Sequence, residues 1–142
     1  MGDLATDRDE IRDLLARYTY AGDRGRIADL ADCFAADGVL EYPGASPVGR
    51  AAIAASLSSG TRDSRLTFVR HHITNPAITV EHDSATARSY FTVHADLGPD
   101  HSGTYDDRLI RTAEGWRLAH RRVRVDWQAD NSLFRRMATR GA

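Results

Sequence analysis

The sequence predicts an α+β fold, in which helices of the first half cover one face of a curved, mainly antiparallel sheet from the second half. Apolar residues recur at helical spacing in three segments between residues 6 and 60, and from Leu66 the hydrophobic period changes to two. The 142 residues, 42% of them hydrophobic, suffice for a buried core, and we expect residues 1–142 to form one domain. A strongly bent sheet with helices across its mouth leaves a cone-shaped pocket for a small molecule.

Three helices are expected, over residues 6–25, 26–38 and 48–60. In the first, Ile11 and Tyr18 are two helical turns apart on one apolar face. In the second, Leu30 and Phe34 are one helical turn apart on one apolar stripe, and in the alanine-rich third Ile53 and Leu57 point inward.

Strands are expected over residues 39–44 and 66–74, as two strands within 77–97 around a turn at 81–84, and as two strands within 103–127 around a turn at 113–115. Asn75-Pro76 is expected to end one strand, and residues 98–103 ("GPDHSG") are expected to be a turn-rich connection. The segment from Asn131 onward is expected to be a helical turn or a tail.

Composition limits the choice of partners. There are 19 basic and 20 acidic residues, so the net charge of −1 gives no general attraction to nucleic acid or to an anionic membrane. The single cysteine, Cys33, excludes an internal disulfide, and no segment resembles a signal peptide or a membrane span. We therefore expect a cytoplasmic protein that binds neither nucleic acid nor membrane.

The segment "VRHHITNP" (69–76) places two histidines side by side. On a strand, neighbouring side chains point to opposite faces, so only one imidazole can face the core. We assign the pocket face to Val69, His71 and Ile73. The other face, with Phe68, Arg70 and His72, is expected to lie toward the helices or toward a subunit contact.

The chain resembles the SnoaL-like group of the NTF2-like superfamily, and within it the scytalone dehydratase branch. The resemblance is carried by "ARYTYAGDRGRIADLADCFAADGVLEYPG", "GRAAIAA", "RHHITN", "ATARSYF" and "GTYDDRLIRTAEGWRLAHRRVRVDW". It implies a cone-shaped barrel with a deep apolar pocket, closed by three N-terminal helices. It also implies a homo-oligomer, a trimer or a dimer, since the outer sheet face of this scaffold commonly packs against another subunit.

The resemblance assigns three catalytic residues. The family's aspartate after the first helix corresponds to Asp23, its strand histidine to His71, and a tyrosine that polarises the substrate carbonyl to Tyr42. Other polar positions of that branch differ: a second tyrosine is replaced by Gly22, and a pocket asparagine by Tyr105. The branch's second catalytic histidine, near positions 90–91, has no counterpart. Scytalone itself is therefore not the expected substrate.

These residues suit proton transfer next to a carbonyl group. A carboxylate partner fixes the tautomer of a histidine and stabilises its imidazolium, as a general base requires. A tyrosine hydroxyl aimed at the carbonyl oxygen stabilises the developing enolate. Such chemistry needs no organic cofactor, and no histidine has the spacing of a metal site, so we expect neither cofactor nor metal. The expected lining of the substrate pocket is Tyr18, Phe34, Val69, Ile73, Phe91, Val93, Tyr105 and Leu109.

The favoured function is a cofactor-independent dehydratase or isomerase acting on a small hydrophobic carbonyl compound, such as a polyketide, aromatic or steroid-like intermediate. A polyketide-type cyclase would use the same pocket. A non-catalytic ligand-binding protein or small subunit of the same fold is the alternative from another class. An epoxide hydrolase built on Asp23, Arg88 and Asp107 ranks last.

Overall fold

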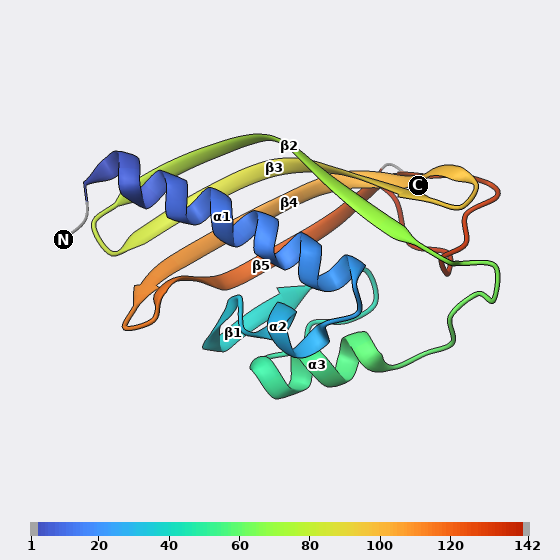
Figure 1. Cartoon of the computed structure of the whole chain (residues 1–142), viewed down its shortest axis with the longest axis horizontal. Coiled ribbons are helices and arrows are strands. Elements are labelled where there is room, and N and C mark those ends of the chain that lie inside the picture. The colour runs from blue at the N-terminus through green and yellow to red at the C-terminus, as the bar shows by residue number, and fades with distance from the viewer. Residues whose placement is uncertain (1–2, 141–142) are drawn as a thin grey trace.

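The computed structural model describes residues 3–140, which form three helices packed on a five-stranded sheet (Figure 1). The helices are α1 (Leu4–Asp23), α2 (Ile27–Ala31) and α3 (Arg50–Ser58). The strands are β1 (Phe34–Glu41), β2 (Val69–Glu81), β3 (Ser84–Ala95), β4 (Gly98–Thr112) and β5 (Gly115–Gln128). The α+β class is confirmed.

The sheet is strongly curved but does not close into a barrel. Its strand order is β1-β5-β4-β3-β2, so β1 and β2 are the two edges. Strand β1 runs parallel to β5, and every other neighbouring pair is antiparallel. Helix α1 lies across one face of the sheet, and α2, β1 and α3 gather beside β5 (Figure 1). In place of a closed cone-shaped barrel, the structure has an open, curved sheet that is covered by helices.

The second helix is shorter than predicted. It ends at Ala31, and Phe34 begins β1 instead of continuing an apolar helical stripe. The backbone at Cys33 instead pairs with the edge of β5, where the N–H of Leu118 donates a hydrogen bond to the carbonyl of Cys33 at 2.8 Å. The side chain of Arg50 donates to the carbonyl of Phe34 at 2.8 Å. Tertiary hydrogen bonds thus override the local helical pattern.

Asn75-Pro76 does not end a strand, contrary to prediction. Strand β2 continues to Glu81, and its register with β3 shifts between Thr74 and Ala77, which marks a β-bulge. Asn75 has φ of 55°, a left-handed conformation that asparagine tolerates better than most residues. The bulge bends the edge strand and so contributes to the curvature of the sheet.

Residues 98–103 are also strand, where the sequence predicts a connection. The turn lies at Asp96 and Leu97, and β4 begins at Gly98, whose φ of 101° suits glycine alone. This places His101 inside the sheet, directly opposite Val93 of β3. Residues 129–140 are an irregular tail, one of the two predicted alternatives, with one bridge between Thr139 and Val125.

Two groups of apolar side chains fill the space under the sheet. The helix-side cluster joins all three helices to the sheet and includes Ile11, Leu14, Leu30, Phe34, Ile53, Leu109, Trp116 and Leu118. The histidine-side cluster lies toward β2 and the C-terminal tail and consists of Val69, Phe91, Val93, Tyr105 and Val125, with Ile73, Phe134 and Met137 packed against it.

The opposite face of the sheet exposes Tyr90 and Trp127, large aromatic side chains available for a contact between subunits. The homo-oligomer stays a prediction. No helix within residues 3–140 is long and apolar enough to cross a membrane.

Asp7 ties the start of α1 to the β4–β5 hairpin. Its carboxylate accepts hydrogen bonds from Arg111 at 2.8 and 3.0 Å and from the indole N–H of Trp116 at 3.1 Å. The hydrogen bonds from Arg111, followed by that from Trp116, lower the pKa of Asp7. The ionised carboxylate is therefore the form that the fold stabilises.

We expect Asp7→Asn to lower the melting temperature at neutral pH. Because the pKa of Asp7 is lower in the folded state, its stabilisation is present above its unfolded pKa, about 3.9, and is lost as the pH falls through the folded pKa. The difference in melting temperature between the wild type and Asp7→Asn should therefore shrink as the pH is lowered toward 3. A constant difference between pH 7 and pH 3 would contradict this account of Asp7.

Candidate active site

Asp23 and His71 meet at one edge of the sheet. Asp23 is the last residue of α1, and His71 is the third residue of edge strand β2. The Asp23 Oδ1 atom lies 2.5 Å from Nδ1 of His71, and Oδ2 accepts the backbone N–H of His71 at 2.9 Å. The Asp23 side chain is only 7% exposed, and that of His71 is 24% exposed. The carboxylate therefore holds both the backbone and the ring of the same residue.

This contact determines which nitrogen of His71 is free to react. A carboxylate only accepts hydrogen bonds, so Nδ1 is the protonated nitrogen and its N–H donates a hydrogen bond to Asp23. The lone pair then resides on Nε2. With its ring still partly exposed, His71 has the arrangement of a general base oriented by a carboxylate.

The neighbouring histidine is on the other face. His72 is exposed and contacts His94 edge to face at 5.1 Å between ring centroids. Val69 is buried and Ile73 partly buried on the same face as His71. Val69, His71 and Ile73 thus share the face that packs under the helices, as Asp23 of α1 contacts His71. The helix side was therefore the wrong environment for His72, and a subunit contact there stays a prediction.

The predicted lining divides between the two clusters. Val69, Phe91, Val93 and Tyr105 belong to the histidine-side cluster, with Ile73 packed against it. The Phe91 ring stacks on Tyr105 at 4.5 Å and lies 6.4 Å from the His71 ring.

The remaining lining residues lie farther from the pair. Phe34 and Leu109 are packed in the helix-side cluster, so they are not part of the apolar group around His71. Tyr18 connects the two groups, since its ring is 6.0 Å from that of Phe34 and 6.1 Å from that of Tyr105. The alternation of side chains along a strand identifies which residues point inward. It does not show whether an inward residue packs in the helix-side cluster or in the histidine-side cluster.

Tyr42 is not joined to the Asp23–His71 pair. Its hydroxyl lies 2.5 Å from Oγ of Ser56 on α3, and within residues 3–140 it makes no hydrogen bond to Asp23 or His71. Its ring packs against the helix-side cluster. Tyr42 also borders a cleft of about 350 Å³ between the end of β1, β5 and the tail, lined by Glu41, Tyr42, Pro43, Arg122, Val123, Arg124, Val125, Ala138, Thr139 and Arg140.

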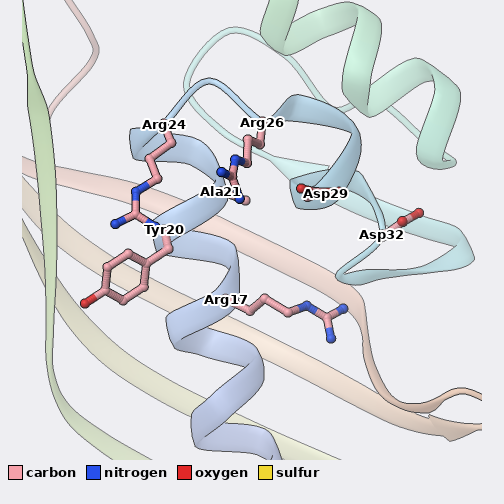
Figure 2. Close-up of a pocket in the computed structure, with 7 residues that line it drawn as sticks. All are labelled: Arg17, Tyr20, Ala21, Arg24, Arg26, Asp29 and Asp32. Carbon is pink, nitrogen blue, oxygen red and sulfur yellow. The ribbon is translucent and has the colours of Figure 1, made fainter.

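A second cleft, of about 270 Å³, lies beside the end of α1. Figure 2 shows Tyr20 and Arg24 on one side of the helix end and Asp29 and Asp32 on the other, with Arg26 between them. The guanidinium of Arg24 stacks on Tyr20 at 4.9 Å. Charges of both signs line this cleft, and none of the predicted site residues does.

A buried arginine lies deep under the sheet, and the sequence analysis did not identify it. Arg121 is fully buried, and its guanidinium donates two hydrogen bonds of 2.8 Å to Asp107. The rings of Tyr18 and Tyr105 lie 4.2 and 3.9 Å from its central carbon. Its Nη1 atom has no hydrogen-bond partner within the described residues. The signal was available, because strand alternation places Arg121 on the inward face with Val123.

Burial and the neighbouring charge of Asp107 shift the pKa of Arg121 in opposite directions. Burial alone lowers the pKa of Arg121, but the charge and hydrogen bonds of Asp107 outweigh it, so the pKa is raised and the guanidinium stays charged. Burial raises the pKa of Tyr105, and the neighbouring Tyr18 adds to this effect. Tyr105 therefore stays protonated near neutral pH and can donate its hydroxyl proton in a hydrogen bond.

Arg88 does not belong to an Asp–Arg–Asp site. Its exposed side chain points outward and pairs with Asp106 at 2.6 Å. The arginine beside Asp107 is Arg121, so the epoxide hydrolase set of Asp23, Arg88 and Asp107 is not assembled. Within residues 3–140, no three His, Cys, Asp or Glu side chains gather as a possible metal site.

The sequence and the fold are similar to those of known proteins. The sequence profile of the SnoaL-like domain matches residues 3–122. The chain belongs to the SnoaL-like family. No curated protein is similar enough in sequence to count as a match.

Solved structures extend the likeness. A variant of Rv3472, a protein of unknown function from Mycobacterium tuberculosis, is 33% identical, with a TM-score of 0.73 over 85% of this chain and 77% of that one. An NTF2-like protein from Novosphingobium aromaticivorans is 32% identical, with a TM-score of 0.76 over 91% and 86% of the two chains. A protein from the same organism, provisionally assigned as a scytalone dehydratase, shares the fold at 23% identity, with a TM-score of 0.79 over 97% and 95%.

The Arg121–Asp107 pair gives a stability prediction for this SnoaL-like domain. We expect Arg121→Met to lower the free energy of unfolding by about 3–5 kcal/mol, because it leaves the Asp107 carboxylate buried without its partner. Urea unfolding measures the effect. The double variant Arg121→Met/Asp107→Leu should recover much of the loss, since it removes both charges. A double variant no more stable than the single one would contradict this explanation.

Proposed function

We propose that this chain is a cofactor-independent acid/base enzyme of the dehydratase or isomerase type. Its substrate is a small hydrophobic carbonyl compound, such as a polyketide, aromatic or steroid-like intermediate. The observation that carries the proposal is the contact between Asp23 and Nδ1 of His71, which leaves Nε2 as a base beside an apolar cluster.

The reaction begins with proton abstraction next to the substrate carbonyl. Nε2 of His71 takes the α-proton, and the C–H electron pair forms the carbon–carbon double bond of an enolate. Asp23 stabilises the imidazolium that results. The imidazolium then returns its proton, either to another carbon in an isomerisation or to a leaving hydroxyl in a dehydration.

We assign the stabilisation of the enolate oxygen to Tyr105 and not to Tyr42. The Tyr105 ring stacks on Phe91 at 4.5 Å, and the Phe91 ring lies 6.4 Å from that of His71. Tyr105 is therefore linked to the pair through one aromatic ring. Its hydroxyl makes no hydrogen bond within residues 3–140, so it is available to the substrate.

Exchange of α-protons tests the proposal without knowledge of the natural substrate. The probe is 2-tetralone, an enolisable fused-ring ketone, and ¹H NMR in D₂O follows the loss of its α-proton signal. We expect the wild type to accelerate exchange over buffer and His71→Ala to slow the enzymatic rate by about 10²-fold or more, since it removes the base. Asp23→Asn should slow it as well, because the amide no longer favours the imidazolium.

Matched variants separate catalysis from folding in this assay. His72→Ala changes the adjacent exposed histidine and should leave the exchange rate near that of the wild type. Tyr105→Phe should slow exchange, whereas Tyr42→Phe should not. A folded His71→Ala variant that exchanges the α-protons of 2-tetralone at the wild-type rate would contradict the proposal. A wild type that binds 2-tetralone without accelerating exchange would instead support a ligand-binding protein.

A further inference from the structure

A second carboxylate–imidazole pair lies under the sheet, at a position that the sequence analysis did not single out. Nδ1 of His101 is 2.6 Å from Oδ1 of Asp100. Both side chains are buried, with 8% and 4% of their surfaces exposed. The pair is not needed to continue the sheet, because the backbone of these residues already takes part in β4.

Strand register places the two paired histidines on the same face. His71 of β2 is directly opposite Val93 of β3, which in turn is directly opposite His101 of β4. Residues directly opposite one another point to the same side of a sheet, and neighbouring strands are about 4.8 Å apart. The Cα atoms of His71 and His101 are therefore separated by about 10 Å, the width of two strand spacings.

One aromatic ring lies between the two histidines. The centroid of Phe91 is 6.4 Å from that of His71 and 6.1 Å from that of His101. The ring of Phe134, from the tail, contacts His101 edge to face at 4.9 Å. The two imidazoles thus lie on either side of an aromatic ring, a group that stacks favourably on a planar ring of a ligand.

The environment of His101 determines its hydrogen-bonding role. Asp100 also accepts the hydroxyl of Ser132 at 2.7 Å and the N–H of Leu133 at 2.8 Å. Burial raises the pKa of Asp100, but hydrogen bonds from Ser132, His101 and Leu133 outweigh it and lower the pKa, so the carboxylate is ionised. Burial lowers the pKa of His101 despite the carboxylate. At neutral pH, His101 is a neutral ring with its proton on Nδ1.

The other ring nitrogen, Nε2, is then a hydrogen-bond acceptor. It makes no hydrogen bond within residues 3–140. A neutral imidazole nitrogen with a lone pair accepts a hydrogen bond. In a small uncharged carbonyl compound, the common hydrogen-bond donor is a hydroxyl group.

We propose that Nε2 of His101 accepts a hydrogen bond from a hydroxyl group of the substrate. The substrate is then a hydroxylated cyclic carbonyl compound that lies against Phe91, with its reactive α-proton at His71 and its hydroxyl at His101. This assignment rests on the function proposed above and narrows its substrate class. His101 acts as a substrate-binding residue.

Anchoring of the tail is the competing explanation for the pair. Asp100 holds Ser132 and Leu133, and these hydrogen bonds involve the carboxylate alone. They would persist with any ring of similar size at position 101, and they do not depend on the lone pair of Nε2. The two explanations therefore differ in what they predict for the hydrogen-bonding character of the ring.

Two naphthalenes that differ in one donor test the proposal. 2-Naphthol has a hydroxyl, whereas 2-methoxynaphthalene has the same ring system without a donor. With ¹⁵N-histidine-labelled protein, we expect 2-naphthol to shift the Nε2 resonance of His101. We expect the wild type to bind 2-naphthol about tenfold more tightly than its ether, the effect of one hydrogen bond.

Three variants make the test specific. His101→Phe should bind both naphthalenes with similar affinity, and His72→Phe, an exposed control, should keep the wild-type preference. Asp100→Asn keeps the ring but lets an amide N–H donate to Nδ1, which moves the ring proton to Nε2. The preference for the hydroxyl should then disappear, although the ring is unchanged, and a purely structural pair would not produce this effect.

The outcomes are distinguishable from a failure of the proposed function. A preference for 2-naphthol that persists in a folded His101→Phe variant, or a shift confined to His71, would overturn the role of His101. So would the absence of binding by either naphthalene to the wild type. The exchange of 2-tetralone, measured separately, decides whether His71 is a base in each of these cases.

Discussion

The whole site depends on a single carboxylate that holds an edge strand by two atoms. Asp23 accepts the backbone N–H of His71 with one oxygen and its ring nitrogen with the other. In an antiparallel edge strand, every second N–H points away from the sheet and lacks a partner. Asp23 satisfies one of these donors and at the same time orients the imidazole. A shift of β2 by one residue would present His72 in place of His71 and break both contacts.

Much of the fold could be predicted from periodicity, and the errors occurred where a tertiary contact overrode it. The change of period at Leu66 correctly separated helices from sheet. The prediction of one continuous helix through Leu30 and Phe34 was wrong. The backbone of β5 forms hydrogen bonds that favour a strand from Phe34 onward. Asn75 and Gly98 carry turn signals, yet both lie within strands, since a bulge and a tight hairpin also require a positive φ.

The pairing of Asp23 with His71 came from the family resemblance, because no local pattern relates residues 48 positions apart. His101 was missed because the glycine and proline before it concealed its strand, and its burial depends on the tail. Arg121 was missed because strand alternation shows the side that a residue faces but not the depth at which it lies. Tyr42 shows the opposite problem: a matched motif placed it in the site, while the fold gives its hydroxyl to Ser56.

The interior combines apolar packing with several buried charged and polar side chains. Asp100, His101, Asp107 and Arg121 are all buried. Each has a partner of complementary hydrogen-bonding type, which limits the desolvation cost, but a wholly apolar interior would be simpler and no less stable. Within the described residues, Nη1 of Arg121 and Oγ of Ser89 are buried without a hydrogen-bond partner.

The tail after β5 shapes the surroundings of the histidines without being part of the regular sheet. Phe134 and Met137 pack against the histidine-side cluster, and residues 129–140 are held by one β-bridge and by hydrogen bonds such as those of Ser132 and Leu133 with Asp100. A substitution of Phe134 or Met137 therefore changes the apolar surroundings of His101 and lies outside every strand and helix. Under the proposed function, such a substitution would change which ligand is bound and would leave the Asp23–His71 pair in place.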